Sequence, residues 1–476
     1  MKREDLLSKI SDPSKVWDVV VIGGGATGLG VAVDAVTRGY SVALFEWEDF
    51  AKATSSRSTK LVHGGVRYLA QGDVSLVLEA LYERGLLQQN APHLVKNQSF
   101  LIPNYRYWDN FLYTVGLTIY DILAGRLSLG RSKYVSKKKT TSYLPTVRVD
   151  GLKGGVVYHD GQFDDSRLAV NLAQSCVENG GCPINRMKVT AMLHGSDGRA
   201  RGVKVQDLMN GQEYEVKAKA VINATGIFVD SIMEMDVPTH EHMVKPSQGV
   251  HLVLDKSFLQ SDYAIMIPKT DDGRVLFAVP WHDKVVVGTT DTLREHPELE
   301  PQALESEIEF ILNTAGRYLT RKPQRSDVLS VFAGLRPLAA PKKEGKSTKE
   351  ISRSHKIFVS ENKLITITGG KWTTYRRMAE DTVDKAIELN LLEKKACVTK
   401  KFRIHGYQLN PDLNNHLYIY GSDIQAIKTL MQSDPAMAEK LHPKYDYTVA
   451  EVVWAVREAP KYYNPLKGLL FCPCGC

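Results

Sequence analysis

WDVVVIGGGATG, residues 17–28, is the stretch that decides the fold. Its first half is an apolar run, which predicts a buried parallel strand, and the small residues from about Ala26 to Thr37 predict a helix directly after it. SVALFE, residues 41–46, predicts the next strand. The chain therefore begins with a βαβ unit, which is typical of a doubly wound α/β domain.

The turn between this strand and helix has the spacing of a dinucleotide-binding loop. Gly23 allows the tight turn, Gly25 lets a phosphate approach the backbone, and Gly28 lets helix and strand pack closely. The diphosphate would lie at the helix N-terminus, where free N–H groups favour negative charge. Glu46 ends the second strand, where an acidic group accepts hydrogen bonds from an adenosine ribose. The cofactor contacts expected in this unit are Gly23, Gly24, Gly25, Thr27, Gly28 and Glu46.

Two later segments favour FAD over NAD as the dinucleotide. VINATG, residues 221–226, is a strand that runs into a small-residue turn, and we expect Ala224, Thr225 and Gly226 to lie beside the same diphosphate. Gly369-Gly370 opens a third such turn before a helix, and its N–H groups suit a flavin edge that gains charge on reduction. Any one of these could be an ordinary strand and turn, but three in this order favour an FAD site.

The pattern of expected strands and helices divides the 476 residues into three domains. Short β-like runs broken by polar turns, over residues 247–290, are typical of an antiparallel sheet. Strand, turn and helix texture returns over residues 364–372, which makes the first domain discontinuous. The predicted domains are an FAD-binding domain of residues 1–245 and 350–396, an antiparallel-sheet substrate domain of residues 246–349, and a small C-terminal helical domain of residues 397–476.

Composition limits the class of protein. With 43% hydrophobic and 24% charged residues, the chain has the balance of a soluble globular protein. Its net charge of +7 suits an anionic substrate, an anionic cofactor or an acidic membrane surface, and we find no base-reading element for nucleic acid. Six cysteines in this length do not make a disulfide framework, and Cys472, Cys474 and Cys476 lack the spacing of a zinc site. No metal site is expected.

The apolar segments of the chain are short. The N-terminus has no apolar core of a signal peptide, and no apolar run reaches membrane-spanning length. The scattered Cys176, Cys182 and Cys397 are typical of the reduced thiols of a cytoplasmic protein. FLYTVGLTIYDILA, residues 111–124, comes nearest, but it is short and carries Asp121. We expect a buried helix there, with a segment that rests in a membrane interface as the alternative.

Four motifs carry a resemblance to a known family. They are TSSRSTKLVHGGVRYL at residues 54–69, GTTD at 288–291, FAGLRPL at 332–338 and GGKWTTYR at 369–376. With these motifs in this order, the chain resembles the FAD-dependent glycerol-3-phosphate dehydrogenases, within the superfamily of glycine oxidase and D-amino-acid oxidase, from about Trp17 to Glu458. The resemblance implies oxidation of sn-glycerol 3-phosphate to dihydroxyacetone phosphate, with FAD as cofactor and a membrane quinone as electron acceptor.

The resemblance also implies which residues form the site. The further contacts to the flavin cofactor would be Thr54, Ser55, Ser56, Ser58, His63, Gly64, Gly369, Gly370, Lys371, Thr373 and Thr374. The substrate side would hold His63, Arg67, Tyr68, Arg336, Arg353 and Lys371. Four converging cations suit a dianionic phosphate, because arginine forks supply directional hydrogen bonds and lysine supplies a point charge.

His63 is the candidate base for the substrate hydroxyl, because an imidazole titrates near working pH and a guanidinium does not. The alternative is that His63 only hydrogen-bonds the flavin or shapes its loop. Arg336 is expected to steady developing charge on oxygen while the other three cations hold the phosphate, with these roles exchangeable. His251 could face the pocket, but a structural role is favoured.

Three alternative functions stay open. A glycerol-3-phosphate oxidase would pass electrons to oxygen, an amine or amino-acid oxidase would need fewer cations, and a flavin-binding protein without turnover would need no catalytic residues. A quinone acceptor implies peripheral contact with the cytoplasmic face of the inner membrane, and a homodimer is an open expectation. After Glu458 the sequence departs from the family pattern, since Pro460 and Pro465 do not continue a regular helix.

Overall fold

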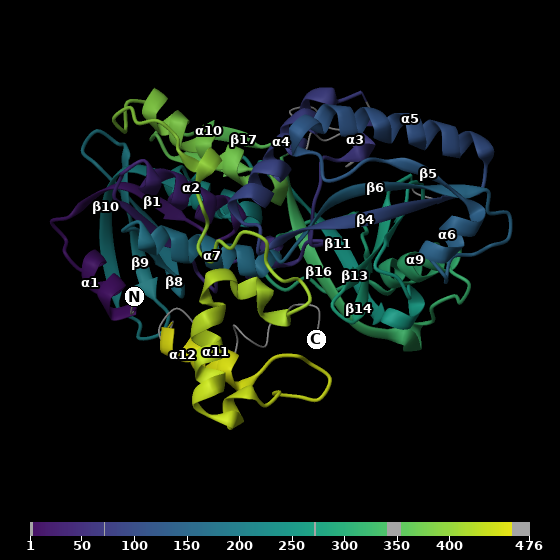
Figure 1. The fold of residues 1–476 in the computed structure, drawn as a ribbon. Helices are drawn as coiled ribbons and strands as arrows, with labels where there is room; N and C mark the ends of the chain where they lie inside the picture. The colour runs from purple at the N-terminus through teal and green to yellow at the C-terminus, as the bar shows by residue number, and fades with distance from the viewer. Residues whose placement is uncertain (1–2, 71, 271–272, 340–353, 459–476) are drawn as a thin grey trace.

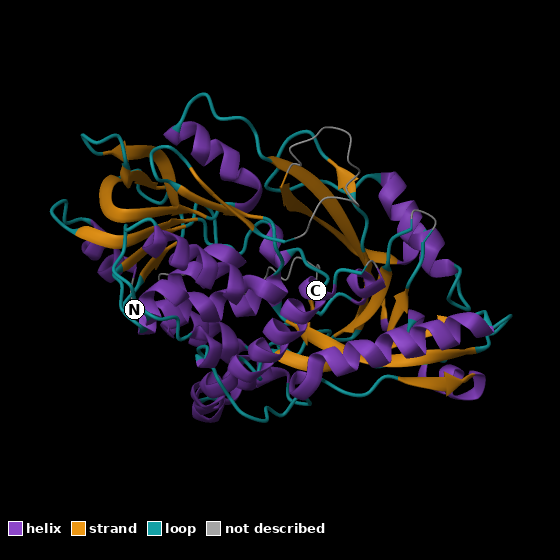
Figure 2. Ribbon diagram, turned by 90° about the horizontal axis from the view of Figure 1, so that it is seen from above, coloured by secondary structure: helices purple, strands orange, loops and turns teal. Residues whose placement is uncertain are grey.

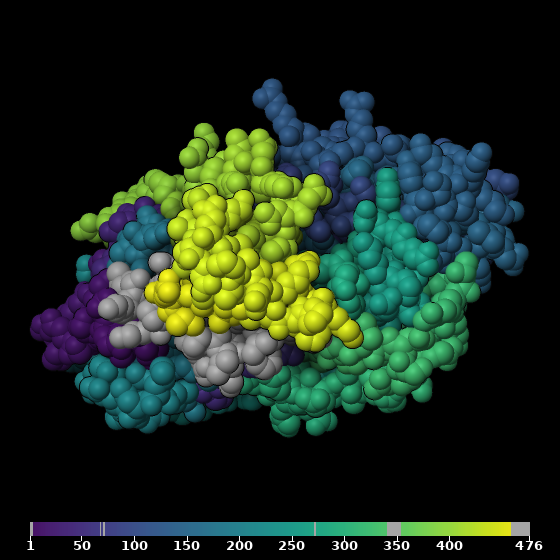
Figure 3. Space-filling model, turned by 60° about the horizontal axis from the view of Figure 1, so that its bottom comes forward, coloured from purple at the N-terminus to yellow at the C-terminus, as the bar shows by residue number. Residues whose placement is uncertain are grey.

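A computed structural model describes residues 3–70, 72–270, 273–339 and 354–458 of the chain. The molecule has two β-sheets, one in each half, with helices packed around them (Figure 1, Figure 2). The last described residues, up to Glu458, gather in one patch, which is yellow in Figure 3. The atypical tail after Glu458, with its three closely spaced cysteines, lies outside the described residues.

The elements of the described chain have the following bounds. The α-helices are α1 (Arg3–Ile10), α2 (Ala26–Thr37), α3 (Val66–Ala70), α4 (Val74–Asn90), α5 (Tyr107–Ala124), α6 (Lys137–Tyr143), α7 (Asp165–Glu178), α8 (Val229–Asp236), α9 (Glu305–Gly316), α10 (Tyr375–Glu388), α11 (Ile424–Ser433) and α12 (Val449–Glu458). The strands of sheet A are β1 (Val16–Ile22), β2 (Val42–Phe45), β7 (Cys182–Ile184), β8 (Met187–His194), β9 (Ala200–Asp207), β10 (Glu213–Asn223), β17 (Lys356–Val359) and β18 (Ile365–Thr368). The strands of sheet B are β3 (Leu61–Val62), β4 (Val95–Asn104), β5 (Lys133–Ser136), β6 (Gly154–Phe163), β11 (Val244–Asp255), β12 (Ala264–Ile267), β13 (Leu276–Trp281), β14 (Lys284–Gly288), β15 (Thr292–Leu293) and β16 (Val328–Ala339).

Sheet A has the parallel core that the sequence predicts. Its strand order is β17-β18-β10-β1-β2-β7, and β1 pairs in parallel with both β2 and β10, while β10 pairs in parallel with β18. Ile22 lies beside Phe45 and Asn223, and Asn223 lies beside Thr366, so these strands end at one edge of the sheet. The register confirms the Rossmann-type α/β class, and it brings the ends of four distant segments together.

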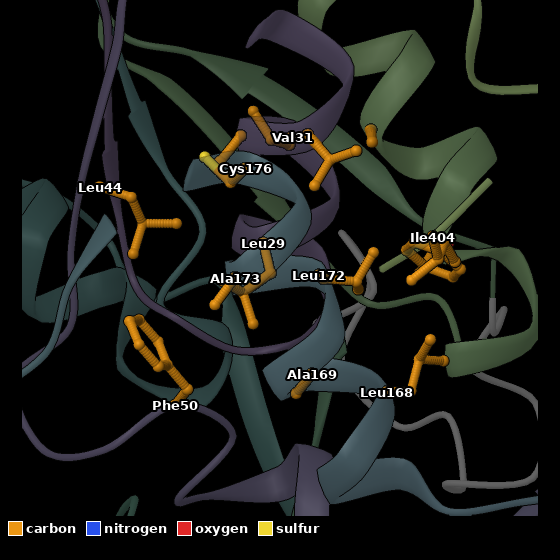
Figure 4. Packing of buried hydrophobic residues seen from close by; sticks show 14 of the residues in the cluster. Leu29, Val31, Leu44, Phe50, Leu168, Ala169, Leu172, Ala173, Cys176 and Ile404 are labelled. Atoms are coloured by element: carbon orange, nitrogen blue, oxygen red, sulfur yellow. The ribbon is translucent and has the colours of Figure 1, made fainter. Parts of the chain in front are cut away.

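Helix α2 is buried because its residues are small and apolar on nearly every side. Its Leu29 and Val31 share a core with α7 residues such as Leu172, and Figure 4 shows these side chains next to one another. A Cβ on Gly28 would lie 1.9 Å from the Gly23 carbonyl oxygen, so the first turn of α2 can approach the loop only with glycine at that position. Each buried leucine or valine contributes about 1.5–3 kcal/mol, which fixes the loop against the sheet.

Sheet B joins two separate parts of the sequence. β11 pairs antiparallel with β14 and β16, as expected for the substrate domain. β3 to β6 also belong to sheet B, although they come from residues 61–163, which the prediction placed with the FAD-binding domain. β4 and β6 are paired over their whole length, and β4 joins β12. Local periodicity predicts that a segment is a strand, whereas long-range packing decides which sheet it joins.

Helix α5 packs on sheet B and leaves most of its apolar side chains exposed. Its buried residues are Asn110, Leu117, Tyr120 and Ala124. The expectation of a buried helix over residues 111–124 is therefore wrong. The helix carries apolar side chains on more than one face, and the sheet covers only one of these faces. The large apolar side chains that α5 exposes are Tyr107, Trp108, Phe111, Leu112, Val115, Ile119 and Ile122. Within the described ranges, no helix is long and apolar enough to cross a membrane.

The last described residues form turns and short helices, which agrees with the predicted helical C-terminal unit. Ile404, Leu417, Ile427 and Trp454 belong to the same buried cluster as α2 and α7. The C-terminal unit thus covers the outer side of the helices that pack on sheet A. Its nearest contribution to the site is indirect, through the support of α2.

Candidate functional site

A cavity of about 520 Å³ lies between the carboxyl edge of sheet A and the inner side of sheet B. It is where the predicted segments meet. The predicted site residues that line it are Gly23, Gly25, Thr27, Glu46, Thr54, Ser55, Ser58, His63, Tyr68, Ala224, Thr225, Gly226, Arg336, Gly369, Gly370, Lys371 and Thr373. Apolar side chains such as Ile22, Phe100 and Met266 complete the wall, so an aromatic ring system could be enclosed there.

The loop after β1 leaves room only for a bare backbone. Gly23 has a φ of +104°, and a Cβ there would lie 2.7 Å from the Ala224 carbonyl oxygen. At the start of α2, the Ala26 N–H donates to the Ser55 hydroxyl oxygen at 2.9 Å. Gly24 and Gly28 lie behind the cavity wall, where they let the loop fold tightly rather than face the cavity. Gly25, Ala26 and Thr27 put the N-terminus of α2 at the cavity wall, where the helix dipole favours an anion such as the predicted diphosphate.

Glu46 lies at the end of β2, next to this loop. Its carboxylate oxygens accept hydrogen bonds from the Gly24 N–H at 2.7 Å and the Glu48 N–H at 2.8 Å. Burial raises the pKa of Glu46 to about 7, while these two N–H groups act in the opposite direction. The carboxyl group is held in a fixed orientation at the cavity wall, where a ribose hydroxyl could meet it.

Residues 54–58 form a short connection whose polar groups bind both halves of the molecule. The Thr54 hydroxyl donates to the Leu335 carbonyl oxygen at 2.6 Å, and Nε1 of Trp372 donates to the Ser55 carbonyl oxygen at 2.7 Å. The Ser58 hydroxyl donates to Asp165 at 2.6 Å. Ser56 is buried and is not among the residues that line the cavity.

The turn after β18 reaches the cavity through two glycines. Gly369 and Gly370 have φ values of +78° and +75°, and a Cβ on Gly370 would lie 2.4 Å from the sulfur of Met378. Lys371 and Thr373 follow and line the cavity, while Thr374 is buried behind them. This turn therefore places two backbone amides and one lysine at the same wall.

His63 and Tyr68 line the cavity next to that turn. The His63 N–H donates to the Thr373 hydroxyl at 3.3 Å, and the His63 ring lies 6.5 Å from the Phe277 ring. Nζ of Lys371 lies 4.0 Å from the centre of the Tyr68 ring, which is a cation–π contact. Gly64 lies behind the wall, against Leu81. Three segments far apart in the sequence thus meet at His63.

Arg336 reaches the cavity from β16 of sheet B. Its guanidinium donates to the Thr289 hydroxyl and to the Thr290 carbonyl oxygen, both at 3.1 Å, and lies 3.6 Å from Asp291. Asp291 is buried and also lies 4.0 Å from Nε of Arg274. Two guanidinium groups share one carboxylate here, so the wall keeps an excess of positive charge.

Arg274 is a cavity residue that the sequence analysis missed. It follows a polar turn that carries no recognisable motif, and a lone arginine is usually a surface residue. The other two predicted cations cannot be placed in the same way: the side chain of Arg67 and the whole of Arg353 lie outside the described residues. Among the predicted cations, the structure therefore brings Arg336 and Lys371 to one cavity.

His251 lines the cavity but is buried in the body of sheet B. Its Nε2 lies 2.9 Å from the Thr59 hydroxyl, and its ring stacks on Phe332 at 4.8 Å. Burial lowers the pKa of His251 to about 3, and Arg336 and Lys60 contribute to the same shift. The ring stays neutral at working pH, which agrees with the structural role that the sequence analysis favoured.

Comparisons with known proteins agree with this geometry. Residues 18–376 match the family model described as FAD dependent oxidoreductase. The chain is 45% identical to a mitochondrial glycerol-3-phosphate dehydrogenase of Arabidopsis thaliana, over 83% of this chain and 64% of that protein. It is 38% identical to a mitochondrial glycerol-3-phosphate dehydrogenase of Mesocricetus auratus, over 96% of this chain and 67% of that protein. The chain thus spans about two thirds of the length of these curated relatives.

A solved structure is also similar. The glycerol-3-phosphate dehydrogenase of Bacillus halodurans, complexed with FAD, superposes with a TM-score of 0.70 at 31% identity. The match covers 96% of this chain and 77% of that one. The similarity therefore extends over both sheets and includes the cavity between them.

Proposed function

The chain belongs to the family of FAD-dependent oxidoreductases, among its glycerol-3-phosphate dehydrogenases, and from this premise we propose that it oxidises sn-glycerol 3-phosphate to dihydroxyacetone phosphate. One observation carries the proposal: Lys371 and Arg336 line the same cavity as His63 and the glycine-rich loop. A cavity with a dinucleotide loop, a histidine and converging cations suits a reaction in which a phosphate ester is oxidised.

The residues of this chain fit FAD. Gly23 and Gly370 keep backbone exposed where any side chain would collide, and the α2 N-terminus supports a diphosphate. The groups that would hold the cofactor are the loop at Gly23, Gly25 and Thr27, Glu46, Thr54, Ser55, Ser58, residues 224–226, Gly369, Gly370 and Thr373. When bound, FAD supplies the ring system that accepts the hydride from C2 of the substrate.

The substrate would be held by its phosphate group. Lys371 is the described cation that we expect to hold it, and Arg274 adds a guanidinium at the cavity wall. Arg336 lies in the same cavity and would steady charge on oxygen or, with the roles exchanged, hold the phosphate. Because the cavity is recessed between the two sheets, charge–charge attraction there is screened less than on an open surface. We expect Arg67 and Arg353 to complete the set, as the family motif implies.

His63 would accept the proton of the substrate hydroxyl. Oxidation of the secondary alcohol removes a hydride from C2 and a proton from the oxygen, so a base is needed next to the cavity. The ring of His63 lines the cavity beside Phe277, and its backbone is held by Thr373. A neutral imidazole can take that proton near neutral pH, whereas lysine and arginine remain charged.

Product formation tests the proposed reaction. The holoenzyme is supplied with glycerol 3-phosphate and a soluble quinone analogue in air, and dihydroxyacetone phosphate, reduced quinone and peroxide are all measured. We expect one reduced quinone for each dihydroxyacetone phosphate and little peroxide. Peroxide formed in equal amount with the product would make the protein an oxidase, and no product with any acceptor would reject the reaction itself.

We propose that α5 docks on an anionic membrane surface, where the quinone would be reached. Seven large apolar side chains of α5 are exposed on one outer side of sheet B (Figure 1). Exposed cations precede and follow α5 in the chain: Arg106 before it, and Arg126, Arg131 and Lys133 after it. An apolar helix face with a basic border suits the boundary between acyl chains and anionic headgroups. The proposed location is the cytoplasmic face of the inner membrane.

Replacing Trp108 and Phe111 together with serine should weaken binding to vesicles that contain anionic phospholipid by at least about tenfold, because each buried aromatic side chain contributes about 1.5–3 kcal/mol. These side chains are 69% and 58% exposed, so the fold should tolerate the change. Vesicle flotation at low and high salt measures the effect. Leu409→Ser, at a residue that is 66% exposed outside α5, is the control. Equal binding of both variants would reject α5 as the membrane contact.

A further inference from the structure

A buried polar junction lies where α4, α5 and β6 meet, directly behind His63. Arg84 of α4 donates to one oxygen of Asp160 of β6 at 2.7 Å, and the Tyr120 hydroxyl of α5 donates to the other oxygen at 2.8 Å. Arg84 also donates to the Leu127 carbonyl oxygen at 3.1 Å. The side chains of Arg84 and Asp160 and the whole of Tyr120 are no more than 2% exposed. An ion pair that is so deeply buried and bonded holds its surroundings in one arrangement.

This junction is in direct contact with the segment that carries His63. The Gly64 N–H donates to the Tyr120 hydroxyl oxygen at 2.7 Å. A Cβ on Gly64 would lie 2.6 Å from that oxygen and 2.5 Å from Leu81, so the backbone at Gly64 packs directly against Tyr120 and Leu81. Burial holds the pKa of Tyr120 well above its ordinary value, so the neutral phenol accepts from Gly64 and donates to Asp160 at once.

We propose that Tyr120 is a positioning residue, whose hydroxyl sets the place of the His63–Gly65 backbone and through it the His63 ring in the cavity. The inference rests on the proposed function, in which His63 receives a proton. Tyr120 does not line the cavity, and it acts through Gly64. Proton transfer depends on donor and acceptor lying within hydrogen-bond distance, so a displacement of well under 1 Å at Gly64 is expected to be felt at His63.

Loss of the hydroxyl should move the segment rather than unfold it. A phenylalanine at position 120 keeps the ring packing against Val77, Leu81 and Ala124. The buried Gly64 N–H, however, loses its acceptor, which costs about 1–3 kcal/mol if nothing replaces it. The next acceptor is Asp160, whose pKa is raised by burial and lowered by Arg84, Tyr120 and the Gly64 N–H. The N–H is therefore expected to turn toward Asp160 and to draw His63 with it.

The test compares Tyr120→Phe with wild type and with Tyr113→Phe, all as FAD-loaded proteins. Tyr113 is a partly buried tyrosine on the same helix, outside the junction. We measure anaerobic reduction of the bound flavin by glycerol 3-phosphate, the visible spectrum of the flavin, the Tm, and hydrogen exchange of the Gly64 amide. For Tyr120→Phe we expect about tenfold slower reduction, equal to about 1.4 kcal/mol, with the Kd for substrate changed less than about twofold. The Gly64 amide should exchange faster, and the Tm should be close to wild type.

The outcomes separate this inference from the proposed function. If wild type is reduced by glycerol 3-phosphate and Tyr120→Phe matches it in rate and in Gly64 exchange, the positioning role is rejected. A slower reduction that is accompanied by a large fall in Tm, or by a matching loss of bound FAD, would also reject the positioning role, because a purely structural role gives that result. If wild type is not reduced at all, the proposed function fails, while faster Gly64 exchange and a shifted flavin spectrum in Tyr120→Phe still support the placement of the segment by Tyr120.

Discussion

Replacing His63 with asparagine should lower kcat for glycerol 3-phosphate by about 10²–10⁴-fold, which is the usual contribution of a positioned general base. Asparagine keeps a polar side chain of similar size, and the bond to Thr373 comes from the backbone N–H of residue 63, so that bond should persist. KM should change little, because the phosphate is held by other groups. Steady-state kinetics with a soluble quinone analogue measures both constants.

The pH profile distinguishes the two roles considered for His63. A base must be neutral to accept a proton, so kcat/KM of wild type should fall as pH drops and imidazole becomes protonated. That acidic limb should be missing in His63→Asn. A variant that keeps the limb and loses less than about tenfold in kcat would mean that His63 shapes the flavin loop and is not the base. His242→Asn, an exposed histidine that pairs with Glu234, is the control.

Replacing Lys371 or Arg336 with alanine should lower kcat/KM for glycerol 3-phosphate by about 10–150-fold each, because a hydrogen bond to a charged group contributes about 1.5–3 kcal/mol. Most of the loss should appear as a higher KM, since the phosphate is bound in both the ground state and the transition state. Arg336 could also lower kcat, because it is expected to steady charge on oxygen. Steady-state kinetics at low salt measures the change.

Glycerol separates a phosphate-binding role from general damage. Wild type should prefer glycerol 3-phosphate to glycerol strongly, and the preference should shrink in both alanine variants because they lose contacts to a phosphate that glycerol lacks. Arg325→Ala removes an exposed arginine that pairs with Glu305 at 3.0 Å, and it should leave the preference unchanged. If both site variants kept the wild-type preference, the cations would have another task. Removal of Arg336 leaves buried Asp291 with less compensation, so the Tm is measured alongside.

The cofactor half of the site could be predicted because its signals are local. The strand, the glycine loop, α2 and Glu46 follow one another within residues 17–46, and parallel pairing places the ends of β1 and β2 side by side. The helix expected from about Ala26 to Thr37 is α2, with those bounds. Such features depend on backbone geometry and neighbouring residues, which the sequence displays directly.

The substrate half depended on the family resemblance and on contacts between distant segments. No sequence motif near Arg274 predicts that it shares Asp291 with Arg336. The two arginines approach Asp291 only when β16 lies beside the residues that follow β14. The Tyr120–Gly64 bond joins residues 56 positions apart in the same way. The assignment of β3 to β6 to sheet B and the exposure of α5 follow from packing between layers, which periodicity in a single segment does not encode.

Anaerobic mixing of the oxidised holoenzyme with glycerol 3-phosphate tests the central claim most directly, namely that a doubly charged ester is held beside the flavin and oxidised there. The absorbance of the oxidised flavin should be lost in a single turnover, with one dihydroxyacetone phosphate formed for each flavin. Glycerol at the same concentration should reduce the flavin far more slowly. A flavin that stays oxidised with the phosphate ester but is reduced by dithionite, or that reacts equally well with glycerol, would contradict the account.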